Sequence, residues 1–197
     1  MAVVSIKNKL RRGNLLVGNE AYDPGGMVPI ATTVVGSGGT TSAIEFTSIP
    51  STYSHLQLRW IARTNRASFP DYLRLRFNSD SGTNYSYHLL YGNGSSASAS
   101  ATTTVSSIEL DGAATGAAQS ASIFAAGVID ILDYKDTNKY KTTRHLLGWD
   151  GNGSGSIYFS SGNWRNTNAI TSVAFALGSG TTIQEYSSFA LYGIKSA

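Results

Sequence analysis

Short alternations of apolar and polar residues, separated by turn signals about every ten residues, constrain the fold of this chain most. His55–Arg63 shows the pattern, with Leu56, Leu58 and Trp60 on one face and Gln57 and Arg59 on the other. Further strands are expected at Ser42–Ile49, Tyr72–Phe77, Tyr85–Tyr91, Ile108–Leu110, Ile123–Leu132, Tyr140–Trp149, Ser156–Ser161, Ile170–Leu177 and Ser187–Ile194. No helical period exceeds one turn. The pattern predicts an all-β protein, an antiparallel β-sandwich of jelly-roll type.

Composition supports a packed core made without cysteine. Hydrophobic residues make up 41% of the 197 residues, and there is no Cys, which excludes disulfides, thiolate metal sites and a cysteine nucleophile. Two sheets of this size are expected to enclose the large aromatic side chains. These are Trp60, Phe77, Trp149, Phe159, Phe175 and Phe189. No apolar run is long enough to span a bilayer, and the start of the chain has no secretory signal.

The charge divides the chain into an arm and a body. Four of the fifteen basic residues lie in the first twelve positions without any acid, which leaves 11 basic and 12 acidic residues in the remainder. The turn signal Tyr22–Gly26 then marks a boundary. We expect residues 1–26 to be an extended anchoring arm and residues 27–197 to be the sandwich domain. The arm's contact residues are expected to be Lys7, Lys9, Arg11, Arg12, Leu15, Leu16 and Val17. A near-neutral body is a poor binder of nucleic acid, so no specific nucleic-acid partner is expected.

Residues 94–107 consist of Gly, Ser, Ala and Thr apart from Val105. This stretch is either a flexible loop or a flat, exposed strand of small side chains.

The sequence offers no catalytic constellation, and we expect neither an enzyme nor a cofactor nor a metal site. His55, His88 and His145 lie on different predicted strands without a metal-ligand spacing, although a Ser–His–Asp triad assembled in space stays open. The acids Glu45 and Glu109 are isolated, so no glycosidase pair is evident. The turn at residues 150–154 predicts a tight hairpin, and whether it also binds a cation is left open.

Arginines gather on two neighbouring predicted strands. If residues 55–63 and 72–77 pair as a hairpin, four arginines share one sheet face: Arg59, Arg63, Arg74 and Arg76. Like charges facing one another favour an anionic partner across them. Pairing with acids of this chain and an oligomer interface are both open.

Several segments together resemble virion structural proteins of tailed bacteriophages, including cyanophages, often described as tail fibre or capsid decoration proteins. The segments are Ser5–Lys9, Leu15–Asn19, Tyr22–Gly25, Ile44–Tyr53, Leu75–Ser86, Tyr91–Gly94, Asp130–Tyr134, Gly162–Arg165, Ala169–Ser172 and Leu191–Lys195. They are turn and strand signatures that cover most of the chain, and none is a catalytic motif.

The resemblance implies a non-enzymatic structural protein on the exterior of a phage particle, docked through its arm to a major capsid or tail protein and assembled as a homotrimer. Because no heptads and no shaft-like repeat are present, a capsid decoration, or cement, protein is favoured. The alternative is a tail fibre or tail adaptor whose knob binds a host glycan. Its contact would be Trp164 in the segment 161–168, or the face of Tyr85, Tyr87 and Tyr91, and packing between the sheets is the competing interpretation of each.

Overall fold

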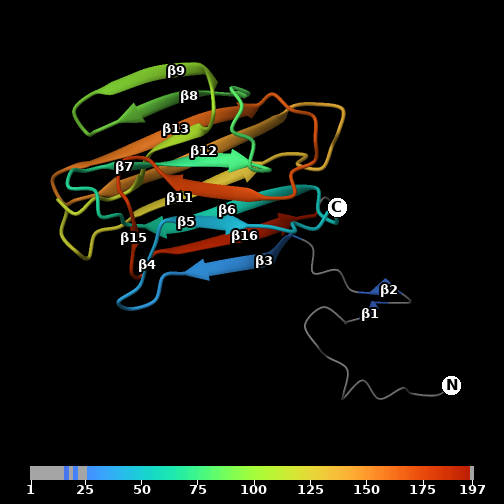
Figure 1. The fold of residues 1–197 in the computed structure, drawn as a ribbon, viewed down its shortest axis with the longest axis horizontal. Helices are drawn as coiled ribbons and strands as arrows, with labels where there is room; N and C mark the ends of the chain where they lie inside the picture. The colour runs from blue at the N-terminus through green and yellow to red at the C-terminus, as the bar shows by residue number, and fades with distance from the viewer. Residues whose placement is uncertain (1–15, 18–19, 22–25, 196–197) are drawn as a thin grey trace, which may run out of the picture.

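The computed structural model describes residues 16–17, 20–21 and 26–195, and it shows a sandwich of two antiparallel sheets (Figure 1). The larger sheet contains, in spatial order, β3 (Met27–Val34), β16 (Ser188–Ile194), β6 (His55–Ala62), β11 (Ala125–Ile131), β12 (Lys141–Asp150), β13 (Gly155–Trp164), β8 (Tyr85–Gly92) and β9 (Ala97–Val105). The smaller contains β10 (Ile108–Ala114), β7 (Asp71–Phe77), β14 (Val173–Leu177) and β5 (Ala43–Phe46). The predicted all-β sandwich is confirmed.

Two small ribbons accompany the sandwich. β4 (Thr40–Thr41) pairs with β15 (Ile183–Gln184), and β1 (Leu16–Val17) pairs with β2 (Glu20–Ala21). Most of the predicted arm, residues 1–15, 18–19 and 22–25, lies outside the described residues.

The core forms because alternate residues of each strand point between the sheets. On β6, Leu56, Leu58 and Trp60 are buried as the alternation predicts, and the Trp60 Nε1 donates a hydrogen bond to the Ala113 carbonyl oxygen, 2.8 Å away on β10 in the opposite sheet. Five of the six predicted core aromatics are buried, whereas the prediction that Phe159 lies in the core is wrong. It is 58% exposed, because it faces outward from β13.

The predicted hairpin between β12 and β13 is confirmed. Its two central residues, Asn152 and Gly153, have φ angles of 55° and 107°, and the Gly151 nitrogen donates to the Ser154 carbonyl oxygen at 2.6 Å. Positive φ at both positions is what a two-residue turn needs to match the strand twist, and Asn-Gly adopts it at little cost.

The low-complexity stretch is a strand rather than a loop. β9 is the outermost strand of the larger sheet, next to β8, and its side chains are mostly exposed. In Figure 1 these two strands extend past the smaller sheet, so the inner faces of both are only partly covered. β9 contains no charge and no proline, whereas the opposite edge strand, β3, contains Pro29.

Candidate functional site

The outer face of the larger sheet has an apolar patch that no described segment covers. Strand pairing places Val128, Leu146, Phe159 and Leu90 side by side on β11, β12, β13 and β8, in one row across the sheet. Leu146, Phe159 and Leu90 are 47%, 58% and 53% exposed. A contiguous exposed apolar surface of this kind marks an interaction site more often than a solvated surface.

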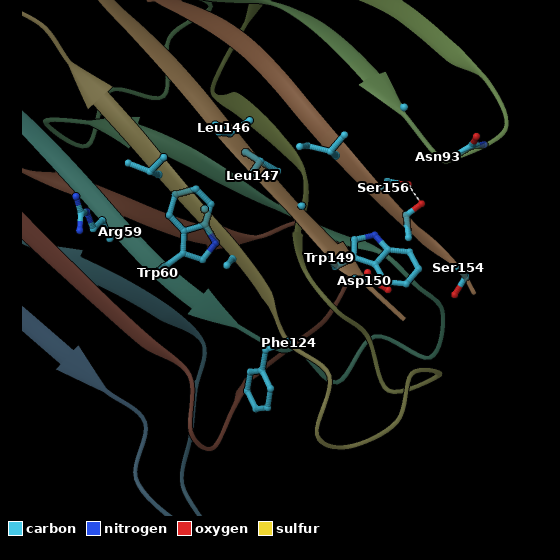
Figure 2. Close-up of a pocket in the computed structure, with 18 of the residues that line it drawn as sticks. Arg59, Trp60, Asn93, Phe124, Leu146, Leu147, Trp149, Asp150, Ser154 and Ser156 are labelled. Carbon is cyan, nitrogen blue, oxygen red and sulfur yellow. Dashed lines mark hydrogen bonds between the residues drawn. The ribbon is translucent and has the colours of Figure 1, made fainter. Parts of the chain in front are cut away.

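A hollow adjoins this row (Figure 2). The next row across the sheet runs through Ile61, Ala126, Gly148 and Ile157, so two small residues lie between two large exposed ones. The hollow has a volume of about 1020 Å³, and Arg59, Phe124 and Ser156 are among the residues that line it. We call this hollow and the row beside it, formed by Val128, Leu146, Phe159 and Leu90, the outer patch.

A polar row borders the outer patch. Arg59 Nε donates to Gln57 Oε1 at 2.7 Å, and Gln57 Nε2 donates to Asp130 Oδ1 at 2.7 Å, so these residues form a hydrogen-bonded chain. Asp130 pairs across the strands with Arg144. An apolar centre with a charged rim is the anatomy of a protein interface.

The predicted hairpin of arginines is wrong. β6 lies in the larger sheet and β7 in the smaller, so Arg59 and Arg63 do not share a sheet face with Arg74 and Arg76. The segment between the two strands passes from one sheet to the other instead of turning back. Adjacent strands in a sandwich often do this, and the strand pattern alone does not distinguish the two routes.

Three of these four arginines, namely Arg63, Arg74 and Arg76, have partners elsewhere in the chain that satisfy their guanidinium groups. Arg63 is buried and donates to the carbonyl oxygens of Gln119, Ser120 and Ile123, and burial lowers its pKa. Arg76 donates to the Ser106 carbonyl oxygen at 3.0 Å.

Arg74 contacts Glu109 through an ion pair at 3.7 Å, and its guanidinium lies 5.2 Å from the centre of the Tyr72 ring. Of the four arginines, only Arg59 is exposed.

Trp164 is a core residue, so its predicted glycan contact is wrong. It ends β13 and is 1% exposed, and its ring stacks with that of Tyr85 at 6.3 Å between centroids. Tyr85 and Tyr87 are buried too, and burial raises the pKa of each to about 12. Of the four predicted glycan contacts, only Tyr91 is partly exposed.

His145 belongs to a buried hydrogen-bond chain. Its Nδ1 lies 2.8 Å from Ser160 Oγ, its Nε2 lies 2.6 Å from Thr143 Oγ1, and burial lowers its pKa to about 3. It is 1% exposed between the sheets, where no substrate reaches it.

His55 contacts Asp133, with 3.3 Å between Nδ1 and Oδ1, at the far end of the same sheet. His88 lies on the outer face of β8. The three histidines are therefore separate from one another, and no triad forms among the described residues.

The described part of the chain contains no group of three or more His, Asp or Glu placed to hold a metal ion. At the turn after β12, Asp150 Oδ1 accepts a hydrogen bond from the Asn152 nitrogen at 2.8 Å, which stabilises the turn. The described residues also include no helix that could cross a membrane. Of the predicted arm residues, only Leu16 and Val17 lie within the described backbone.

Comparison with known proteins gives no relative: no family model, no curated protein and no solved structure matches this chain.

The outer patch was missed by sequence reasoning, although a signal for it exists. Leu89–Leu90, Leu146–Leu147 and Ile157–Phe159 each place apolar residues on both faces of a strand. A strand with one solvated face alternates instead. Three neighbouring strands that are apolar on both faces therefore indicate an apolar outer surface on this part of the sheet.

Proposed function

We propose that this protein is a non-enzymatic structural subunit that associates with further copies of itself through the outer patch. Following the resemblance of its sequence, we place it on the exterior of a tailed-phage particle, as a capsid decoration protein. The observation that carries the proposal is the apolar row from Val128 to Leu90 across four strands. A subunit that remained alone would expose this row to water permanently.

Burial of the patch supplies the energy for association. Full burial of a side chain such as Phe, Leu or Ile is worth about 1.5–3 kcal/mol. Phe159, Ile157 and Leu90 are each between 53% and 60% exposed, so each has roughly half of that gain still to make. Association through this face therefore has a driving force that the folded monomer leaves unused.

A second copy of the chain suits the patch in size and in charge. The whole outer face of the larger sheet, with eight strands at ~4.8 Å spacing and each seven to ten residues long, covers on the order of 1,000 Å². A stable interface needs roughly 800 Å² from each partner, so a second copy would cover the outer patch together with most of the face around it. The rim contains both Asp130 and Arg144, so two copies related by a two-fold axis can each oppose an acid with a base. The patch is thus complementary to itself. The trimer that the resemblance implies stays a prediction.

The position on a phage particle rests on the resemblance, and docking by residues 1–26 stays part of the proposal. The alternative, a tail fibre or adaptor with a glycan-binding knob, loses its principal contact because Trp164 is buried.

The mass of the purified protein in solution tests self-association. Light scattering after gel filtration is expected to give a multiple of 20.9 kDa for the wild type. Phe159→Asp introduces a charge into the centre of the patch and is expected to shift the mass to the monomer. Tyr140→Asp is the matched control, since Tyr140 is 54% exposed but lies outside the patch, and it should leave the oligomer unchanged.

A monomeric wild type would contradict self-association, and an oligomer that is indifferent to Phe159→Asp would place the interface elsewhere. A monomer that exposes its patch only after residues 1–20 are deleted would identify the chain's own leading segment as the occupant. The virion proposal has a separate test. Labelled particles viewed by negative-stain microscopy should show the protein on the capsid, and deletion of residues 1–20 should prevent its incorporation.

A further inference from the structure

A groove on the flank of the sandwich lies where β8 and β9 extend past β10. It has a volume of about 470 Å³, which falls within the roughly 300–1,000 Å³ of small-molecule sites. Its lining includes Arg66, Tyr72, Tyr91, Ser100, Asp111 and Tyr158, and we call it the lateral groove. It opens between the sheets and is separate from the outer patch, with which it shares no lining residue.

The Asp111 carboxylate in this groove has no hydrogen-bond partner among the described residues. Its neighbour Glu109 is satisfied, because it accepts from the Tyr87 hydroxyl at 3.1 Å and lies 3.7 Å from the Arg74 Nε. Burial, with a further contribution from Glu109, raises the pKa of Asp111. The carboxylate oxygens remain open to solvent, so water hydrates them in the free protein, and a ligand with hydroxyl donors can replace that water.

The backbone at Asp111 is shaped by a bulge. The register of β10 against β7 shifts between Leu110 and Ala114, and Gly112 within this bulge has a φ of 71°. A Cβ at Gly112 would lie 2.3 Å from the Tyr158 ring, so the glycine lets β10 pass directly against that ring. Bulges of this kind re-aim a side chain and are common beside binding sites.

Aromatic rings and hydroxyl groups form the rest of the lining. The rings of Tyr91 and Tyr158 stack with centroids 5.5 Å apart and an angle of 19° between their planes. Ser100 and Thr102 line the groove from the inner side of β9. Tyrosine combines a flat apolar ring with a polar hydroxyl, which suits ligands that have both kinds of surface.

We infer that the lateral groove binds a neutral carbohydrate, with a sugar ring against Tyr91 and its hydroxyl groups donating to Asp111. A sugar has an apolar ring face and many hydroxyl donors, and it therefore matches both the tyrosines and the unpaired carboxylate. An apolar ligand would leave Asp111 without a donor. An anionic ligand would be repelled by Asp111, and Arg66, the cation that lines the groove, already lies 3.7 Å from Asp71 and donates to the Pro70 carbonyl oxygen.

The inference goes beyond the proposed function and does not depend on it, because the groove and the outer patch lie on different sides of the sheet. If the protein proved to be a monomer, the carbohydrate inference would still stand. If no carbohydrate bound, the proposal of self-association would still stand. The sequence pointed to Tyr91 for a glycan contact but not to Asp111, which the bulge brings into the groove.

Saturation-transfer NMR on the full chain tests the inference. The probes are maltotriose, cellotriose, xylotriose, mannotriose and chitotriose, each titrated to 10 mM, with spermidine as a cationic comparison. Saturable binding of at least one trisaccharide is expected. Asp111→Ala and Tyr91→Ala should each weaken this binding at least tenfold, while Tyr140→Ala, outside the groove, should leave it unchanged.

Three results would overturn the inference: no saturable binding of any trisaccharide, binding that both groove variants retain, or spermidine binding in place of sugar binding. Asp111→Asn guards against a folding defect, because it keeps the shape of the side chain. It is expected to fold with the wild-type circular dichroism spectrum and to weaken sugar binding less than Asp111→Ala does.

Discussion

The indole Nε1 of Trp164 donates a hydrogen bond to Asp80 Oδ2 at 2.7 Å, across 84 positions of sequence. Asn84 and the Gly82 nitrogen donate to the same carboxylate, at 3.0 and 2.8 Å. The bond fixes the end of β13 against the turn that follows β7.

Asp80→Ala is therefore expected to destabilise the protein by about 2–3 kcal/mol, since the buried indole N–H loses its acceptor. Urea unfolding at neutral pH measures the loss. Asp80→Asn keeps one acceptor oxygen and should cost less than half as much. Equal losses in the two variants would show that the hydrogen bond is not the cause. Burial opposes ionisation of Asp80, but its hydrogen bonds outweigh burial and lower its pKa, so this stabilisation should persist until the pH falls below the ordinary carboxyl range.

His145 predicts a pH dependence with a definite sign. Burial lowers its pKa to about 3 from an ordinary 6.5. Between these pH values His145 is therefore protonated in the unfolded chain but neutral in the folded chain. The free energy of unfolding should fall with decreasing pH between these values, by up to about 1.4 kcal/mol per pH unit from this residue. His145→Gln should be less stable than the wild type at pH 7, and the gap should narrow toward pH 4. Parallel curves from urea unfolding at pH 7, 5.5 and 4 would contradict the prediction.

Gly127→Ala tests the close approach of β11 to Trp60. A Cβ at Gly127 would lie 2.1 Å from the indole ring, which has no room to move between the sheets. The variant is expected to lose more than about 2 kcal/mol, with a drop of the melting temperature by at least 5 °C or so. Gly92→Ala is the matched control within a strand, because its Cβ would meet nothing closer than 3.8 Å and should be tolerated. Similar melting temperatures for the two variants would refute the steric explanation.

Lys141 is a fully buried lysine that satisfies backbone groups rather than a carboxylate. Its Nζ donates to the carbonyl oxygens of Asp136, Lys139 and Thr167, at 2.6 to 3.0 Å. Lys141→Met leaves these three acceptors without a donor, and a loss of about 3 kcal/mol or more is expected.

Lys135→Met provides the comparison, since Lys135 is exposed and, among the described residues, donates only to the Ser51 carbonyl oxygen. It should change the melting temperature very little. A tolerated Lys141→Met would show that the three carbonyl groups find other donors.

The sequence predicted most strands of the sandwich because alternation and turn residues are local signals, but it named no strand at Met27–Val34 and left Ala97–Val105 open between a loop and a strand. The Asn152-Gly153 turn and the buried face of β6 are examples of such local signals. It did not predict which sheet a strand joins, because the route between Arg63 and Asp71 depends on contacts formed only in the folded chain. The arginine hairpin failed for this reason.

The functional surfaces were hidden from the sequence for a related reason. Trp164 was assigned to the segment 161–168 because the predicted strand ended at Ser161, whereas β13 continues to Trp164. Its hydrogen-bond acceptor, Asp80, is distant along the chain and gave no local signal. Phe159 looked like a core residue because hydrophobicity does not state which face it occupies. Asp111 belongs to no recognisable sequence motif, and its position in the groove depends on the bulge at Gly112.

The two edge strands of the larger sheet, β3 and β9, differ in how readily they can pair with an additional strand. At β3, Pro29 lacks an N–H and interrupts any added ladder, whereas β9 offers nine residues with neither proline nor charge. Main-chain pairing of the larger sheet with a neighbouring polypeptide is thus favoured at β9 alone. Two copies that pair β9 with β9 would leave no such edge free on that sheet, so the pairing would end at two molecules.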